Sequence, residues 1–255
     1  ESLNCTYTTR RAWENLGQIW QLGIQLNPRN ATLYQEMADT MATMGGHHVE
    51  TATLYYREAG VLLMKRENML TDSLIMFRKG LKLRPERCDL NYWSAIAYQK
   101  RLQKRGYKKI WQDKMIRFFR LAMKPHCNDT ALNSANELLG VFDKKDYVRV
   151  AGILDHLIVA RPDVKSSYAR TASTYWEEAA RSVLSDSQDM SRAARYYSNS
   201  IKYGISFSSC SSFKAASVLS SSSSKDSGIT FEVNGKILNA KSLASMAQQC
   251  EHGVV

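Results

Sequence analysis

One short pattern, a helix face of small and aromatic residues that ends at a proline, most constrains how this chain folds. Ser73, Phe77 and Gly80 are spaced four and then three residues apart, which places them on one face of a helix. Pro85 follows five residues after Gly80 and ends that helix. Small residues on both sides of an aromatic ring predict a face that packs closely against neighbouring helices.

Similar spacing returns along most of the chain and predicts a series of helices joined by short polar turns. We expect ten helices, which pair into five antiparallel hairpins. Pro85, Pro125 and Pro162 lie 40 and 37 residues apart, close to the roughly 34-residue period of helix-hairpin repeats. A single hairpin cannot bury its own apolar face, so the hairpins must stack on one another. The expected helices span residues 13–26, 31–44, 50–67, 70–84, 89–105, 107–124, 131–142, 146–160, 165–185 and 187–203.

Two of these helices carry a pattern that is typical of a known repeat. Trp13, Leu16-Gly17 and Trp20 form a first helix with a large residue, Leu-Gly and an aromatic. The small–aromatic–small face of 73–85 forms a second helix that ends at a proline. In these features residues 11–204 resemble the tetratricopeptide repeat family. The resemblance implies an all-α fold, a right-handed superhelical solenoid of about five antiparallel helix hairpins, with a concave groove that binds a protein segment.

The remaining segments have a different composition. Residues 1–10 are polar and predict an N-terminal tail, whereas 205–228 are dominated by serine and predict a linker or an extension docked on the last hairpin. Phe207, Phe213 and Val218 are the residues expected to make that docking contact. In 229–255, alternation around Asn234-Gly235 predicts a β-hairpin, followed by a short helix at 240–249. We expect this hairpin and helix to cap the solenoid.

The charge of the chain is concentrated in one stretch. The formal net charge is +11, and within 100–124 ten basic residues face one acidic residue, which leaves +9. Two interpretations stay open: a surface that tracks phosphates between aromatic platforms, or a solvated face around a core of aromatics. The aromatics are Tyr98, Tyr107, Trp111, Phe118 and Phe119, and the basic residues are Lys100, Arg101, Lys104, Arg105, Lys108, Lys109, Lys114, Arg117, Arg120 and Lys124.

A second candidate site follows from the resemblance alone. In the tetratricopeptide repeat family the first helix of each hairpin lines the groove. By position, this implies inward-facing side chains at Asn91, Tyr98 and Arg101 in one helix, and at Arg170 and Trp176 in another. For Trp176, packing against the next helix is the competing interpretation.

The cysteines and histidines give little sign of catalysis or metal binding. The five cysteines include no C-x-x-C pair, so they suit free thiols in a reducing compartment. In an exported protein Cys210 and Cys250, which flank the C-terminal segment, would form a disulfide. His126-Cys127 has no third ligand nearby in the sequence, and no phosphate loop or nucleophile motif is present. We therefore predict no enzyme activity, no metal and no cofactor.

These patterns favour a non-enzymatic scaffold or adaptor that binds a protein segment in its groove, as a subunit or domain of a larger assembly. One alternative is binding of RNA or another polyanion, such as anionic lipid or an acidic protein, through 100–124. Another is a scaffold domain of an exported or membrane-anchored enzyme, such as a glycosyltransferase. No apolar run approaches the roughly 18 residues that span a bilayer. A chain that begins with Glu is expected to be a processed product, so both a cytoplasmic and an extracytoplasmic location stay open.

Overall fold

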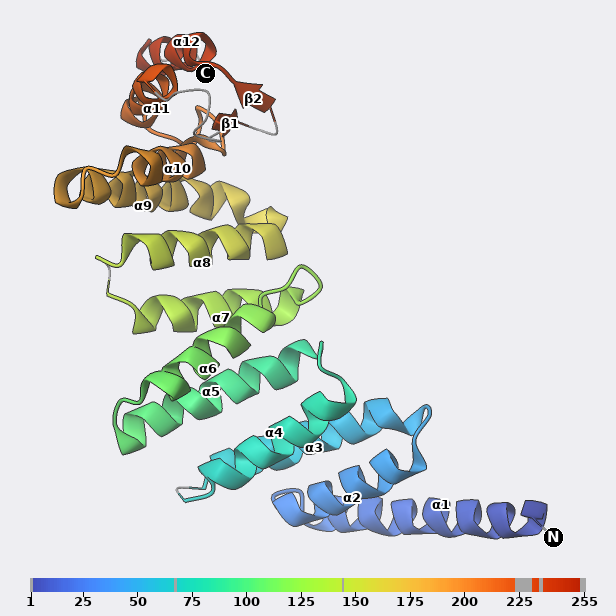
Figure 1. The fold of residues 1–255 in the computed structure, drawn as a ribbon. Helices are drawn as coiled ribbons and strands as arrows, with labels where there is room; N and C mark the ends of the chain where they lie inside the picture. The colour runs from blue at the N-terminus through green and yellow to red at the C-terminus, as the bar shows by residue number, and fades with distance from the viewer. Residues whose placement is uncertain (1, 67, 144, 223–230, 234–235, 253–255) are drawn as a thin grey trace. The chain divides into compact units, whose positions relative to one another are not determined.

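The computed structural model describes residues 2–66, 68–143, 145–222, 231–233 and 236–252. It confirms an all-α fold of antiparallel helices with one small β-hairpin near the C-terminus (Figure 1). The chain divides into two compact units, residues 1–130 and 131–255, and each is described by itself. Within the described residues, no helix has the length and apolar character needed to cross a membrane.

Unit 1 is a series of helices in which each packs against the next along the chain. The turns between them carry local signals. The side chain of Asn30 accepts a hydrogen bond from the backbone N–H of Thr32 and caps the second helix. Gly106, with φ of 78°, follows the fifth helix in a conformation that suits glycine. The helices are α1 Ser2–Leu26, α2 Ala31–Met44, α3 His48–Met64, α4 Leu70–Leu83, α5 Cys88–Arg105 and α6 Lys109–Leu121, and α7 Asn128–Val141 begins at the end of the unit.

The packing face predicted for α4 is confirmed. Phe77 is fully buried, and its ring lies so close to Gly60 on α3 that a Cβ there would come within 3.0 Å of three ring carbons. The buried hydroxyl of Ser73 donates a hydrogen bond to the carbonyl oxygen of Gly60 at 2.8 Å. Gly80 gives Leu90 of α5 the same kind of close approach. The small residues therefore allow α4 to pack tightly on both neighbours.

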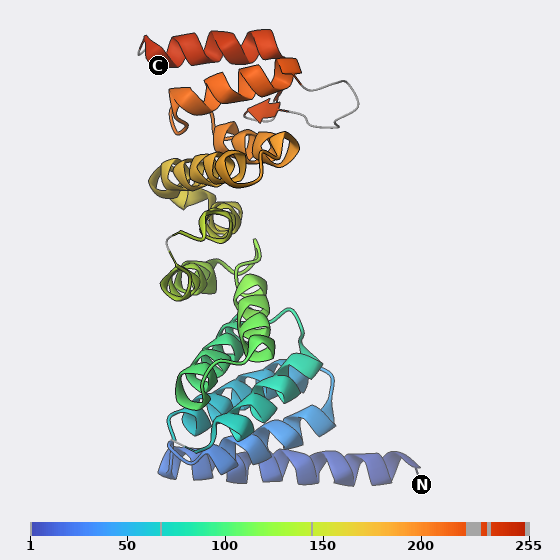
Figure 2. The same cartoon turned by 60° about the vertical axis from the view of Figure 1, so that its left-hand side comes forward.

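Unit 2 continues the helical series and ends in the β-hairpin and a last helix. In Figure 2 helices α9 to α12 follow one another as layers of this unit, and consecutive helices of the group are in contact. In the β-hairpin, Phe231 pairs with Leu238 in antiparallel register. Besides the rest of α7, the elements are α8 Tyr147–Ala160, a 3-10 turn η1 Pro162–Val164, α9 Lys165–Asp186, α10 Met190–Ile201, α11 Cys210–Ser222, β1 Phe231–Val233, β2 Lys236–Leu238 and α12 Ala240–Glu251.

The predicted N-terminal tail, residues 1–10, is helical over its described part. Helix α1 begins at Ser2, so the described part of 1–10 continues the helix. Polar residues alone do not interrupt a helix, and this stretch contains neither proline nor glycine, the residues that would. The segment 223–230 and the turn predicted at Asn234-Gly235 lie outside the described residues.

The serine-rich stretch forms a packed helix, α11, over residues 210–222. Phe213 of α11 is fully buried among residues of α10, α12 and the β-hairpin. Ser212 is also buried, with its hydroxyl 2.9 Å from that of Ser200. Val218, by contrast, is 64% exposed and makes no docking contact of the predicted kind. The linker interpretation therefore fails for 210–222, because small hydroxyls allow close helix packing and satisfy one another by hydrogen bonds.

Substitution of Gly60 by alanine tests the close approach of α3 and α4. The added Cβ would overlap the Phe77 ring, and overpacking of this kind costs about 1–3 kcal/mol. Gly140→Ala is the matched control, because a Cβ there meets nothing within 4 Å, so the better helix former should stabilise the chain by about 0.5–1 kcal/mol. Urea denaturation followed by circular dichroism measures both changes. Equal effects of the two substitutions would contradict the packing described for α4.

Removal of the Phe77 ring tests how much of unit 1 depends on it. Because this side chain is fully buried, Phe77→Ala should lower the free energy of unfolding by about 3–5 kcal/mol. Urea denaturation measures the loss, and Tyr107→Ala, which truncates a 70% exposed ring, is the control. A loss below about 1 kcal/mol for Phe77→Ala would show that the ring is not part of the core.

Candidate functional site

A hollow of unit 1 that is lined by cations and by no carboxylate lies between α4, α5 and α6. It has a volume of about 790 Å³, and we refer to it as the basic groove. Six of its lining side chains are cationic and none is a carboxylate, a histidine or a cysteine. The lining residues are Thr71, Leu74, Ile75, Arg78, Lys79, Leu81, Lys82, Ser94, Tyr98, Arg101, Lys114, Arg117 and Phe118.

Helix α4 supplies half of the cations from the face opposite to its packing face. Arg78 and Lys82 are four residues apart and exposed, so they project on the same side of the helix. Neither forms an ion pair with a described residue. Lys79 is the exception, because its ammonium group lies 2.8 Å from the carboxylate of Asp39.

Asp39 is held in its ionised form by two partners. Burial alone would raise its pKa, but hydrogen bonds from Lys79 and from the hydroxyl of Tyr56 outweigh burial, and the pKa of Asp39 is lowered. The same contact, together with burial, raises the pKa of Tyr56. Lys79 is thus partly neutralised, and the other cations of the basic groove are more available to a ligand.

Helices α5 and α6 contribute cations that rest on aromatic rings. The rings of Tyr98 and Phe118 stack with centroids 5.9 Å apart, and the Lys114 ammonium lies 5.7 Å from the Tyr98 ring centroid. The guanidinium of Arg101 lies 4.4 Å from the centroid of the Trp111 ring. The Nε of Arg101 is buried and has no hydrogen-bond partner among the described residues. The aromatic rings therefore position the cations.

The predicted basic stretch is only partly brought together. Arg101, Lys114 and Arg117 line the basic groove, while Lys100 and Lys104 line a separate hollow of about 360 Å³. The other five lie outside both hollows and are exposed: Arg105, Lys108, Lys109, Arg120 and Lys124. Sequence reasoning missed the α4 cations because it assigned that helix to packing alone. The four-residue spacing of Arg78 and Lys82, opposite the packing face, was the signal that pointed to them.

Two of the predicted groove residues are core residues. Asn91 is 1% exposed, and its side-chain amide donates hydrogen bonds to the carbonyl oxygens of Pro85 and Arg87. Trp176 is 7% exposed, with its indole N–H donating to Asp155 at 2.8 Å. Their assignment to a groove was wrong, because both side chains are buried between packed helices.

The remaining groove residues divide between the two units. Tyr98 and Arg101 belong to unit 1 and line the basic groove. Arg170 is in unit 2, where it is exposed and donates a hydrogen bond to the carbonyl oxygen of Ser206. Only Tyr98 and Arg101 therefore enter the candidate site.

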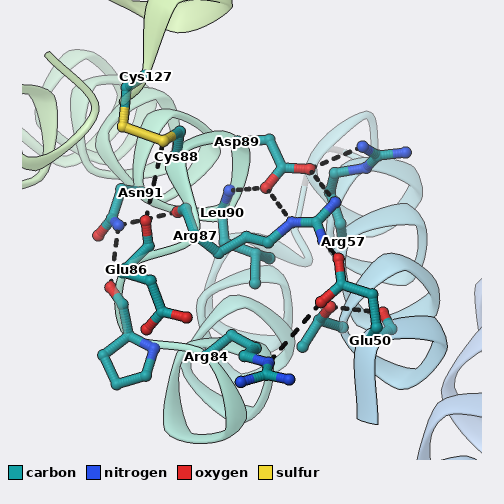
Figure 3. A network of polar contacts seen from close by, with 12 residues as sticks. Glu50, Arg57, Arg84, Glu86, Arg87, Cys88, Asp89, Leu90, Asn91 and Cys127 are labelled. Atoms are coloured by element: carbon teal, nitrogen blue, oxygen red, sulfur yellow. Dashed lines mark hydrogen bonds and ion pairs between the residues drawn. A yellow bond between two sulfur atoms is a disulfide. The ribbon is translucent and has the colours of Figure 1, made fainter. Parts of the chain in front are cut away.

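A second polar region of unit 1 surrounds the start of α5 (Figure 3). Asp89 accepts hydrogen bonds from Arg57 at 2.8 Å and from Arg87 at 2.9 Å, and Glu50 pairs with both Arg84 and Arg87. Burial alone would raise the pKa of Asp89, but the two guanidinium groups outweigh it and lower that pKa. This network stabilises the first turn of α5 and so fixes the helix that carries Tyr98 and Arg101.

Cysteine pairing differs from the free thiols favoured by the sequence. Cys88, the first residue of α5, forms a disulfide with Cys127, in the turn before α7. Cys210 and Cys250 form a second disulfide, the pair expected only for an exported protein. His126 lies beside the first disulfide, and the ligand atoms of these three residues lie within 4.8 Å of one another. The fold thus supplies the third ligand that the sequence around His126-Cys127 lacked.

A buried carboxylate in unit 2 has a structural role. Glu177 is buried and accepts hydrogen bonds from the hydroxyls of Ser209 and Ser211. It also forms an ion pair with Arg181. Burial would raise its pKa, but these partners outweigh burial and lower it. The serines come from the start of the serine-rich stretch, so the carboxylate anchors that stretch to α9.

Comparisons with known proteins place few constraints on the site. No protein-family model matches the chain, and neither does any curated protein. A structure of a human IFIT1 dimer with PPP-AAAA has a TM-score of 0.35 and 20% identity, over 79% of this chain and 48% of that one. A human IFIT1 dimer with m7Gppp-AAAA has a TM-score of 0.32 and 14% identity, over 92% and 57%. The chain spans about half the length of these structures, and likeness at this level decides neither the details of the fold nor the ligand.

Substitution of Asp89 tests the network at the start of α5. Asp89→Asn should lower the free energy of unfolding at pH 7 by about 1.5–3 kcal/mol, since it removes charge-assisted hydrogen bonds. The folded-state pKa of Asp89 lies below its unfolded value of about 3.9. Its contribution is therefore fully present above about pH 5 and is lost as the pH falls through the folded pKa.

Urea denaturation between pH 7 and pH 2.5 measures this difference. Wild type and Asp89→Asn should converge in acid, whereas Asp113→Asn, at an exposed position, should stay within about 0.5 kcal/mol of wild type at every pH. A difference between wild type and Asp89→Asn that is independent of pH would contradict the assignment to the charged carboxylate.

Proposed function

We propose that the chain is a non-enzymatic binding module that holds an acidic, partly apolar segment of a partner protein in the basic groove. The observation that carries this proposal is the lining of the groove, in which six cations meet without a carboxylate. The lining also contains no histidine or cysteine, the side chains that most often act as a general base or as a thiol nucleophile.

Charge favours an anionic ligand. Arg78, Lys82 and Arg117 are exposed and have no ion-pair partner among the described residues, so they repel one another across the same hollow. A ligand carboxylate or phosphate relieves that repulsion and is attracted from a distance by the local field. Steering of this kind weakens as salt shortens the range of the field.

The apolar part of the lining favours a peptide over a nucleic acid. Leu74, Ile75 and Leu81 are only partly buried and line the groove between the cations. Apolar side chains of a peptide would cover these residues, whereas a sugar-phosphate backbone has none. The Tyr98 and Phe118 rings stack on each other, and cations lie over the rings of Tyr98 and Trp111, so these faces are not free to stack on bases.

A role of the chain as a scaffold domain of an exported or membrane-anchored enzyme stays a prediction. The pairing of Cys210 with Cys250 is the observation that favours it, since disulfides persist in oxidising compartments. It is compatible with the proposed binding role, because a scaffold domain acts by holding a partner.

Binding of a fluorescein-labelled peptide of alternating Glu and Leu pairs tests the proposal. Arg78→Glu, Lys82→Glu and Arg117→Glu in one variant should weaken binding at least about tenfold at 0.15 M salt, or about 1.4 kcal/mol. The control variant carries Arg105→Glu, Lys109→Glu and Arg120→Glu, which are exposed positions outside the groove. It changes the net charge by the same amount and should weaken binding less than about threefold, because salt screens distant charges.

A labelled oligouridylate distinguishes the alternative ligand. We expect it to bind more weakly than the peptide at the same salt. Equal loss of peptide affinity in both triple variants would show that general charge, and not the basic groove, attracts the ligand. Tighter binding of oligouridylate than of peptide would replace the proposal by nucleic-acid binding.

A further inference from the structure

We propose that Cys88, Cys127 and His126 form a redox-dependent zinc site. In the oxidised chain the two cysteines form a disulfide. In the reduced chain their thiolates and the His126 imidazole bind one Zn²⁺. The proposal concerns the opposite end of α5 from the basic groove and is independent of the proposed function.

The fold already places the three donors at a distance suited to one metal ion. Their ligand atoms lie within 4.8 Å of one another, and the two cysteine Cα atoms are 5.4 Å apart. With Zn–S bonds of about 2.3 Å in a tetrahedral site, two thiolates lie about 3.8 Å apart. Rotation of two short side chains therefore provides the spacing, and the backbone can keep its path.

The donors are of the kind that selects zinc. Two thiolates and an imidazole are soft and intermediate ligands, which favour Zn²⁺ over Mg²⁺ or Ca²⁺. Cys88 is the first residue of α5, so the helix holds its side chain at a fixed position beside Cys127. His126 is exposed, with a ring nitrogen 3.3 Å from the carbonyl oxygen of Glu86, which holds the imidazole next to the sulfur atoms.

The surroundings give an ion access to the three donors. The donors line a cavity of about 630 Å³ that also includes the exposed residues Glu86 and Asp129. Figure 3 shows the disulfide at the edge of the polar network, with the Glu86 carboxylate pointing away from it. A water molecule completes four-coordination, because neither carboxylate belongs to the group of donor atoms that lie within 4.8 Å of one another. The three arginines of this region pair with three carboxylates, those of Glu50, Glu58 and Asp89, which limits their repulsion of a cation.

The exchange between the two states balances with a small-molecule disulfide as oxidant. The zinc-bound thiolates of Cys88 and Cys127 lose two electrons in total and form one S–S bond, and Zn²⁺ leaves. The oxidant, such as glutathione disulfide, accepts the two electrons and two protons and becomes two thiols. A dithiol or phosphine reductant reverses the change, and each cysteine releases its proton when zinc binds.

Cobalt binding to the full chain tests the site. The chain is reduced with a phosphine, freed of reductant under inert gas, and titrated with Co²⁺. We expect one Co²⁺ per chain with thiolate-to-cobalt absorption, displacement by Zn²⁺, and release by glutathione disulfide. Cys88→Ser and Cys127→Ser should abolish this absorption, and His126→Ala should weaken affinity at least about tenfold. The double variant Cys210→Ser and Cys250→Ser is the control and should retain the site.

Several results would overturn the proposal. They are an unchanged cobalt spectrum in Cys88→Ser, equal cobalt binding by the oxidised chain, and unchanged affinity in His126→Ala. Loss of helical circular dichroism after reduction would also overturn it, because the three donors meet only in the folded chain. The cobalt signal could instead be lost in the Cys210→Ser and Cys250→Ser double variant and kept in Cys88→Ser and Cys127→Ser. That result would place the metal at the cysteine pair of unit 2.

Discussion

The contact between the Phe77 ring and Gly60 is the constraint on which the described arrangement of unit 1 depends. It brings α3 and α4 so close that no side chain fits between them, and the hydroxyl of Ser73 bridges the same helices. Gly80 lets Leu90 approach α4 from the other side. Because packing density in a protein interior leaves little slack, these contacts fix the rotation of α4 about its axis.

That rotation decides where charge is available. With the packing face turned toward α3 and α5, Arg78 and Lys82 must point the other way. They meet Arg101, Lys114 and Arg117 from the next hairpin in one hollow. A concentration of like charge is unfavourable in an empty groove, and the fold tolerates it because close packing elsewhere supplies the stability. The proposed binding role is a consequence of this division of α4 into a packing face and a charged face.

The helices and the packing face of α4 were predictable because both depend on local spacing. The helices of 31–44 and 70–84 were found to within a residue. Features that depend on contacts between distant parts of the chain were not predictable in this way. The pairing of Cys88 with Cys127 joins positions 39 residues apart, and spacing alone does not reveal it. Trp176 is buried in a cluster with Ala151 of α8, and its N–H donates to a carboxylate on the same helix, partners that the sequence does not identify.

The serine-rich stretch shows a different limit of composition. Low hydrophobicity predicts a segment that cannot offset the entropy of ordering, yet Phe213 and the buried serines pack as a helix. A few well-placed apolar residues and mutual hydrogen bonds between hydroxyls are enough when neighbouring helices already provide a surface. Composition averages over positions, whereas burial depends on which positions face inward.

Helix α5 joins the two candidate sites of unit 1, and its length separates them. Cys88 and Arg101 are 13 residues apart, about 20 Å at 1.5 Å per residue. Groups more than about 7–10 Å apart that share no partners contribute to stability almost independently. The Asp89 network lies at the cysteine end and holds the first turn by its ion pairs. An exchange of disulfide for metal therefore changes the end of α5 that the network already fixes, and the basic groove keeps its geometry as long as Phe77 and Leu90 stay packed.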